Sequence, residues 1–141
     1  MAPAPAFLQV LFYIVSLLAP AGTSKIMLSP TANPSDAISF TKTAAGNWAV
    51  GKEASEWKVD GEFVVMHSTK EGGKDERINI APFVGDAPNA SKALATHDWE
   101  KEKTLKLSRG MTVEKSDGGF ILHMQKSAES PVVELRATFT K

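Results

Sequence analysis

Apolar and polar residues alternate over short segments of this chain from Ala37 onward, and no other feature restricts the possible fold as strongly. In residues 133–139 every odd-numbered position is apolar and every even-numbered position is polar. Because successive side chains of a strand point to opposite faces, this pattern predicts an antiparallel strand with one face on a core and the other in water. Similar segments, rich in Val, Ile, Phe, Trp and Thr, are separated by Gly, Asp and Pro, so we expect an all-β protein.

Two Asp-Gly pairs predict β-hairpins. Asp60-Gly61 lies between the apolar segments 57–59 and 63–66, and Asp117-Gly118 lies between 111–114 and 120–124. This dipeptide adopts the positive φ angles that a two-residue hairpin turn requires. Further candidate strands are 26–28, 38–41, 48–50, 77–80 and 104–107, and Asn89 is a candidate cap for a short helix through Ala95. The expected architecture is an antiparallel barrel or a two-sheet sandwich of about eight or nine strands, with at most one short helix.

The N-terminal segment differs from the rest of the chain. Residues 1–21 carry no charged side chain, and an apolar run from Ala6 to Leu18 ends in Ala19-Pro20-Ala21. Small residues at the first and third positions before a cut, after a short apolar segment, are typical of a secretory signal peptide. The run 7–18 is also shorter than the roughly 20 residues of a spanning helix, although an uncleaved membrane anchor is the alternative. We expect residues 1–21 to be a signal peptide, residues 22–141 to form a single β domain, and the mature protein to be secreted or periplasmic without a stable membrane span.

The charge balance and the lack of cysteine exclude several classes of function. The 16 basic and 16 acidic residues give a formal net charge of zero, and all lie after residue 21, with signs that alternate locally. No basic field is present to hold nucleic acid or anionic lipid. The absence of Cys excludes disulfides, thiolate metal sites and cysteine nucleophiles. Asn89-Ala90-Ser91 is a glycosylation sequon, and whether Asn89 is modified stays open.

Three histidines, His67, His97 and His123, are the candidates for a metal site, since imidazole is a common ligand of Zn²⁺ and Cu²⁺. They are far apart in the sequence. Met66-His67 and His123-Met124 are adjacent pairs on candidate strands, so the two members of each pair point to opposite faces and cannot share one ion. We therefore expect no metal site, and we expect no cofactor.

Hydrolase motifs are absent, because the chain has neither a Gly-x-Ser-x-Gly elbow nor a His-Glu-x-x-His helix. Two carboxylates that converge across a sheet could still act as the acid and base of a glycosidase. Asp75, Glu76, Asp98 and Glu100 are the first to inspect, because they lie in or beside predicted loops.

Gly46-Asn47-Trp48 has the Gly-x-Trp form and resembles the opening of the first strand in lipocalins and their smaller bacterial relatives, where the tryptophan closes the floor of a barrel. The resemblance covers this tripeptide and one distant arginine. It implies a structural role for Trp48, with Arg136 stacked on its ring.

The candidate binding residues are Phe83, His97 and Trp99. Trp99 has polar neighbours and is the tryptophan that we expect to be the most exposed, where it covers the rim of the core or serves as a ligand platform, with the rim favoured. Phe83 belongs to the predicted 82–96 loop. Long loops on rigid scaffolds often carry binding. We expect a non-catalytic exported domain that binds a small apolar ligand, a glycan or a protein partner. A glycan-active hydrolase-like domain with paired carboxylates and an envelope structural or inhibitor protein are the alternatives, so the question of enzymatic activity is open.

Overall fold

Ten antiparallel strands form one sheet in the order β6-β5-β4-β3-β2-β1-β10-β9-β8-β7. The computed structural model describes residues 5–51, 55–80, 87–107, 111–124 and 133–141. The strands are β1 (Lys25–Pro30), β2 (Ile38–Lys42), β3 (Trp48–Val50), β4 (Ser55–Asp60), β5 (Phe63–Ser68), β6 (Glu76–Asn79), β7 (Thr104–Leu107), β8 (Met111–Ser116), β9 (Gly119–Met124) and β10 (Val133–Thr140). The other elements are the helix α1 (Pro5–Leu18), the 3-10 turn η1 (Pro34–Asp36) and the helix α3 (Ala87–Thr96). The predicted all-β antiparallel fold is confirmed, and each candidate range overlaps a strand, which gives one strand more than the upper end of the expected count of about eight or nine.

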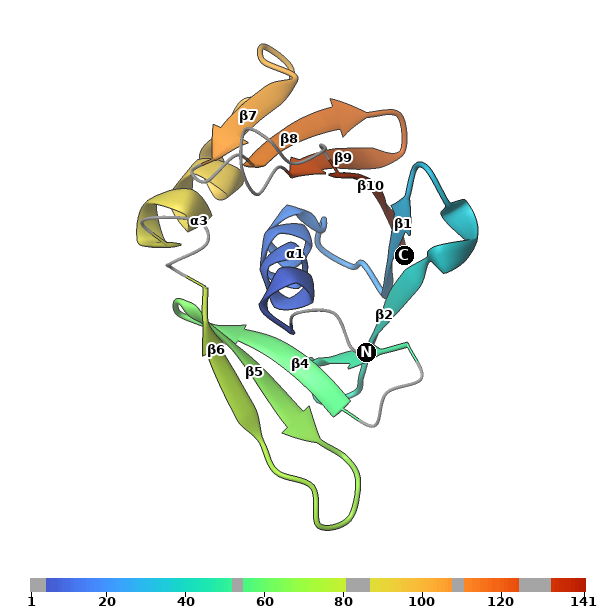
Figure 1. The fold of residues 1–141 in the computed structure, drawn as a ribbon. Helices are drawn as coiled ribbons and strands as arrows, with labels where there is room; N and C mark the ends of the chain where they lie inside the picture. The colour runs from blue at the N-terminus through green and yellow to red at the C-terminus, as the bar shows by residue number, and fades with distance from the viewer. Residues whose placement is uncertain (1–4, 52–54, 81–86, 108–110, 125–132) are drawn as a thin grey trace.

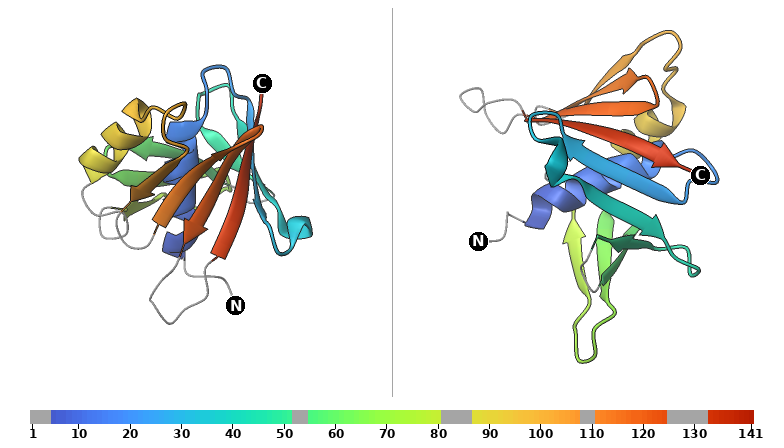
Figure 2. Two further views of the ribbon diagram at one scale, coloured as in Figure 1. Left: turned by 90° about the horizontal axis from the view of Figure 1, so that it is seen from above. Right: turned by 90° about the vertical axis from the view of Figure 1, so that its right-hand side faces the viewer.

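The sheet bends around α1 (Figure 1). Strands β7–β10 lie on one side of this helix, β4–β6 lie on the other, and β1 and β2 connect the two halves. Two further directions of view show α1 between the halves of the bent sheet (Figure 2). Within the described residues the edge strands β6 and β7 are not paired with each other, so the sheet is open, and α3 lies between these edges and contacts α1. The described strands therefore do not close into a barrel, and their arrangement fits a sandwich or an open bent sheet.

The two predicted hairpins form, but the first turn is one residue later than its Asp-Gly pair suggested. Asp60 pairs with Phe63, so Gly61 and Glu62 make the turn, and Gly61 has a φ of 62°. This register pairs Trp57 with Met66 inside the core and keeps Glu62 out of the ladder. A turn at Asp60-Gly61 would instead put Glu62 opposite Val59 in the ladder, on the side of the sheet that faces the core.

The strand that begins the sheet in sequence and the strand that ends it are neighbours in space. β1 pairs with β10 from Lys25 opposite Thr140 to Pro30 opposite Leu135. Periodicity along each strand carries no information on this pairing. The core depends on it, because Leu28 and Ala137 are directly opposite each other and fully buried.

α1 is formed by the segment that we predict to be a signal peptide. Its sequence is apolar around the whole helix, and a helix of this kind is stable only where it is buried on all sides. Pro5 occupies the first helical position, where a missing N–H costs nothing. The helix ends at Leu18, two residues before Pro20. In this structure the segment is a core helix, which is a role that we did not expect, and removal after Ala21 stays a prediction.

The predicted short helix exists, but Asn89 does not precede it. α3 begins at Ala87, so Asn89 lies in its first turn, one residue after Pro88. The early start agrees with the preference of proline for the first turn of a helix. The cap assigned to Asn89 is therefore wrong, whereas the helix itself is confirmed.

Candidate functional site

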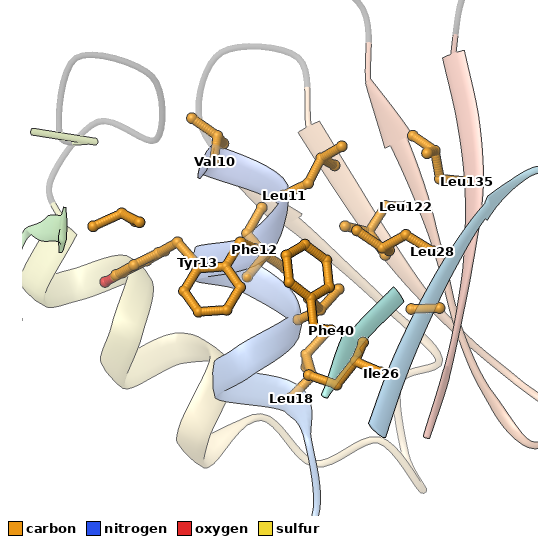
Figure 3. Close-up of a cluster of buried hydrophobic side chains, with 14 of the residues drawn as sticks. Val10, Leu11, Phe12, Tyr13, Leu18, Ile26, Leu28, Phe40, Leu122 and Leu135 are labelled. Carbon is orange, nitrogen blue, oxygen red and sulfur yellow. The ribbon is translucent and has the colours of Figure 1, made fainter. Parts of the chain in front are cut away.

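The inner face of the sheet, which we define as the side that contacts α1, is the most extensive apolar surface among the described residues. Its buried side chains come from nine strands: Ile26, Leu28, Phe40, Trp48, Val50, Trp57, Val64, Met66, Leu107, Met111, Val113, Phe120, Leu122, Leu135 and Ala137. α1 covers this face with six consecutive residues, Val10–Val15, that are each at most 1% exposed. Figure 3 shows Leu28, Leu122 and Leu135 on the sheet at one side of the helix, and Tyr13 directed toward α3 at the other.

Three aromatic rings join α1 to the sheet. The centroid of the Phe12 ring is 5.1 Å from that of Phe40 and 5.5 Å from that of Trp57, with the Trp57 contact edge-to-face. Phe40 and Trp57 also contact each other, at 5.8 Å. Such pairs contribute about 0.5–1.5 kcal/mol each beyond the burial of their area. Phe12 therefore links α1 to two strands of the sheet, β2 and β4.

α1 has three polar side chains, Gln9, Tyr13 and Ser16. The Ser16 hydroxyl donates to the Tyr13 carbonyl within the helix. The Gln9 amide Nε2 donates to the Met66 sulfur at 3.0 Å, and the Gln9 Oε1 atom has no hydrogen-bond partner among the described residues. The Tyr13 hydroxyl is hydrogen-bonded to Ser91 of α3, and burial raises the pKa of this hydroxyl although Ser91 opposes the shift. The helix is thus held mainly by apolar contacts.

The buried part of the inner face carries no charged side chain among the described residues, and Lys42, Lys115 and Glu76 lie at its exposed margin. Among the residues whose burial is described, Gln9 and Thr23 are the buried polar ones, and no ionisable Lys, Arg, Asp, Glu or His side chain is buried. The Lys42 and Lys115 ammonium groups reach only its margin, over the rings of Trp48 and Phe120, at 5.1 and 4.8 Å from the ring centroids. A ligand in place of α1 would meet a neutral surface.

The structure brings two of the three predicted binding residues together. The His97 and Trp99 rings meet edge-to-face with centroids 4.3 Å apart, and the Trp99 ring packs on Phe120 at 5.0 Å, which in turn contacts Phe139. Trp99 is half-buried and covers the rim of the core between α3 and β9, which is one of the two roles expected for it. Phe83 lies outside the described residues, and the binding role of all three stays a prediction.

The lipocalin resemblance implied a stack between Trp48 and Arg136. Trp48 is buried on the inner face, which agrees with a structural role. Arg136 is exposed on β10, three strands away from β3, and the cation over the Trp48 ring is Lys42. The stack with Arg136 is therefore wrong, since odd-numbered positions of β10 face the core and position 136 faces away from it.

The three histidines have separate partners. His67 is exposed and its Nδ1 lies 2.8 Å from Asp75 Oδ1. His97 Nε2 lies 2.8 Å from the Glu102 carbonyl oxygen, and His123 bridges two strands through Glu114 at 3.0 Å and Glu134 at 4.0 Å. The described ranges contain no group of three His, Cys, Asp or Glu residues arranged to hold a metal ion.

The carboxylates proposed for glycan hydrolysis also have structural partners. Asp75 accepts from the Ser68 N–H and contacts His67, and this contact holds the pKa of the Asp75 carboxyl below its usual value. Asp98 accepts from the N–H of Glu100 at 3.1 Å, which forms a turn after α3. Glu76 is exposed on edge strand β6. Glu76 lies opposite Met66 at the exposed edge of the inner face, and none of the four carboxylates is buried.

Comparisons with known proteins give no relative: no family model, no curated protein and no solved structure matches this chain. Among the described residues, no helix combines the length and the apolar character that crossing a bilayer requires. The inner face is the site that sequence reasoning missed. The sequence does show that the N-terminal run is apolar, as the inner-face residues are. It does not show that the two are in contact.

Proposed function

We propose that the protein is exported as a binding module, and that the inner face of the sheet binds an apolar ligand once residues 1–21 have been removed. The observation that carries the proposal is the occupant of this face in the full-length chain. α1 is mostly apolar, carries no charged side chain and lies outside the hydrogen-bonded ladder, so its departure breaks no strand pairing. The ten strands can then present an apolar groove.

The energetics of the groove favour a replacement for α1. Fully burying one large apolar side chain stabilises a fold by about 1.5–3 kcal/mol, and residues 10–15 are all buried, with Phe12 packed on the inner face and Tyr13 directed toward α3. Without them, rings such as Phe40 and Trp57 would contact water as part of one continuous patch. Monomeric proteins rarely expose patches larger than a few hundred Å², and larger ones mark binding sites. A ligand that restores the lost contacts is therefore strongly favoured.

The neutral character of the inner face separates this function from the alternatives. A glycan carries many hydroxyl groups that need polar partners, and a glycosidase needs two carboxylates in a cleft. The described part of the inner face offers neither, since no carboxylate is buried there. An envelope structural or inhibitor protein would use the open edges of β6 or β7, which leaves the groove without a role.

The test compares the protein before and after processing. The complete gene is expressed in a host that exports it, the exported product is purified, and mass spectrometry defines its N-terminus. Binding of N-phenyl-1-naphthylamine, an uncharged apolar dye, is then titrated. The matched control is the unprocessed chain from cell-free translation without membranes, in which α1 fills the groove.

We expect an exported product that begins at Gly22 and binds the dye saturably, while the unprocessed chain does not. An exported protein that retains α1, or one that begins at Gly22 but fails to bind the dye, would contradict the proposal.

A further inference from the structure

We propose that the ligand of the inner face is an uncharged polycyclic lipid with one hydroxyl group, of the sterol or terpenoid-alcohol class. This inference rests on the proposed function above and uses α1 as a template for the occupant. Width, charge and the position of polar groups each restrict the ligand independently.

The width of the occupant favours a ring system. An α-helix with its side chains is about 10–12 Å across, and the 14 residues of α1 span about 21 Å. A single acyl chain would fill a fraction of this cross-section and leave voids, and protein interiors tolerate few voids larger than a water molecule. A fused ring system with a branched tail is wide at one end, long, and rigid. Its flat faces also suit packing on Phe40 and Trp57, which hold the Phe12 ring in the full-length chain.

The lack of charge excludes a buried ionic head group. A fatty acid that enters the groove head first would bury its carboxylate, and an isolated buried charge is strongly unfavourable. No ionisable side chain is buried among the described residues, so no cation is available inside the groove to pair with it. A neutral lipid meets no such penalty.

The polar contacts of α1 locate a single hydroxyl group. The Tyr13 hydroxyl is hydrogen-bonded to the side chain of Ser91 on α3, the helix that packs against α1. At the other polar position, Gln9 reaches only the sulfur of Met66, which is a weak acceptor, and its Oε1 is buried without a partner. The groove thus has one good hydrogen-bonding position. A lipid hydroxyl placed where the Tyr13 hydroxyl lies would use it.

The experiment uses the exported product of the complete gene. Dehydroergosterol, a fluorescent sterol, is titrated with energy transfer from tryptophan as the signal, and cholesterol, 5α-cholestane and cis-parinaric acid compete for the site. Cholestane lacks the hydroxyl group, and parinaric acid is a charged single chain. We expect cholesterol to compete best and parinaric acid to compete at least tenfold less well.

Ser91→Ala tests the hydroxyl position. We expect it to weaken sterol binding about 3- to 10-fold, which is the range of one neutral hydrogen bond, and to leave cholestane binding unchanged. Thr96→Ala, on the same helix, is the matched control, because the Thr96 hydroxyl donates only to the Lys92 carbonyl. Equal competition by parinaric acid, or an equal effect of Ser91→Ala on sterol and cholestane, would overturn this inference. If the naphthylamine dye binds but no sterol does, only this inference fails; if neither binds, the proposed function fails with it.

Discussion

Replacing Phe12 with Ala measures whether α1 belongs to the folded core. Phe12 is fully buried and its ring contacts those of Phe40 and Trp57. Truncation of a buried Phe to Ala costs about 3–5 kcal/mol, and the loss of two aromatic neighbours favours the upper part of this range. We expect the unprocessed chain to lose about 4 kcal/mol of its free energy of unfolding, out of a total of roughly 5–15 kcal/mol.

The assay is urea unfolding of the unprocessed chain from membrane-free translation, followed by tryptophan fluorescence. With a urea dependence of about 2 kcal/mol per M for a domain of this size, the midpoint should fall by roughly 2 M. Phe40→Ala is the matched control, because Phe40 has the same burial and belongs to the sheet. It should destabilise both the unprocessed chain and the exported product.

A comparison of the unprocessed chain with the exported product tests whether α1 packs on the inner face. The exported product of the Phe12→Ala gene lacks position 12 if cleavage follows Ala21, so its stability should equal that of the unsubstituted product. A midpoint shift below about 0.5 M in the unprocessed chain, with Phe40→Ala still destabilising, would show that α1 does not pack on the inner face in solution.

Three further predictions follow from individual contacts. Gln9→Leu should stabilise the unprocessed chain by about 1 kcal/mol in urea unfolding, because it removes a buried Oε1 that has no partner among the described residues; a loss of stability would contradict this. Asp75 should titrate below an ordinary carboxyl in a ¹³C NMR titration, and His67→Ala should raise its pKa, since the contact with His67 lowers it. A lowered folded pKa stabilises the protein above the ordinary carboxyl value, and this contribution is lost as the pH falls toward the folded pKa; an unchanged titration in His67→Ala would refute the assignment. Gly119→Ala should destabilise the exported product by about 1–3 kcal/mol, because a Cβ there would collide with the Ala137 carbonyl oxygen in the next strand; unaltered thermal unfolding would argue against the β9–β10 register.

The local parts of the fold could be predicted from the sequence, because they depend on neighbours in the chain. Asp117-Gly118 makes the turn that its residues require, with Gly118 at a φ of 77°. In β10 the alternation correctly places Leu135 and Ala137 in the core, although Val133 at the start of the strand is 41% exposed. The turn after β4 is displaced by one residue from the Asp60-Gly61 pair, and this register keeps Glu62 out of the ladder.

The site was harder to predict, because it depends on contacts between distant segments. His97 and Trp99 are two residues apart and could be grouped from the sequence. Phe12, Phe40 and Trp57 come from three separate elements, and neither their meeting nor the pairing of β1 with β10 has a local signature. A segment that is predicted to be cleaved off is not assigned to the core. The surface that it covers in the full-length chain is therefore not predicted either.

Because β1 pairs with β10, the sheet cannot be completed during synthesis until the last strand has been made. A ribosome adds about 5–20 residues per second, so the interval between the completion of α1 at Leu18 and the start of β10 at Val133 is roughly 6–23 s. During that interval the sheet of the nascent chain is incomplete, so it cannot bury α1. If residues 1–21 act as the predicted signal peptide, this apolar segment is available to a translocation apparatus before its own sheet is complete, and the 14 residues of α1 would direct export in one setting and complete a core in the other.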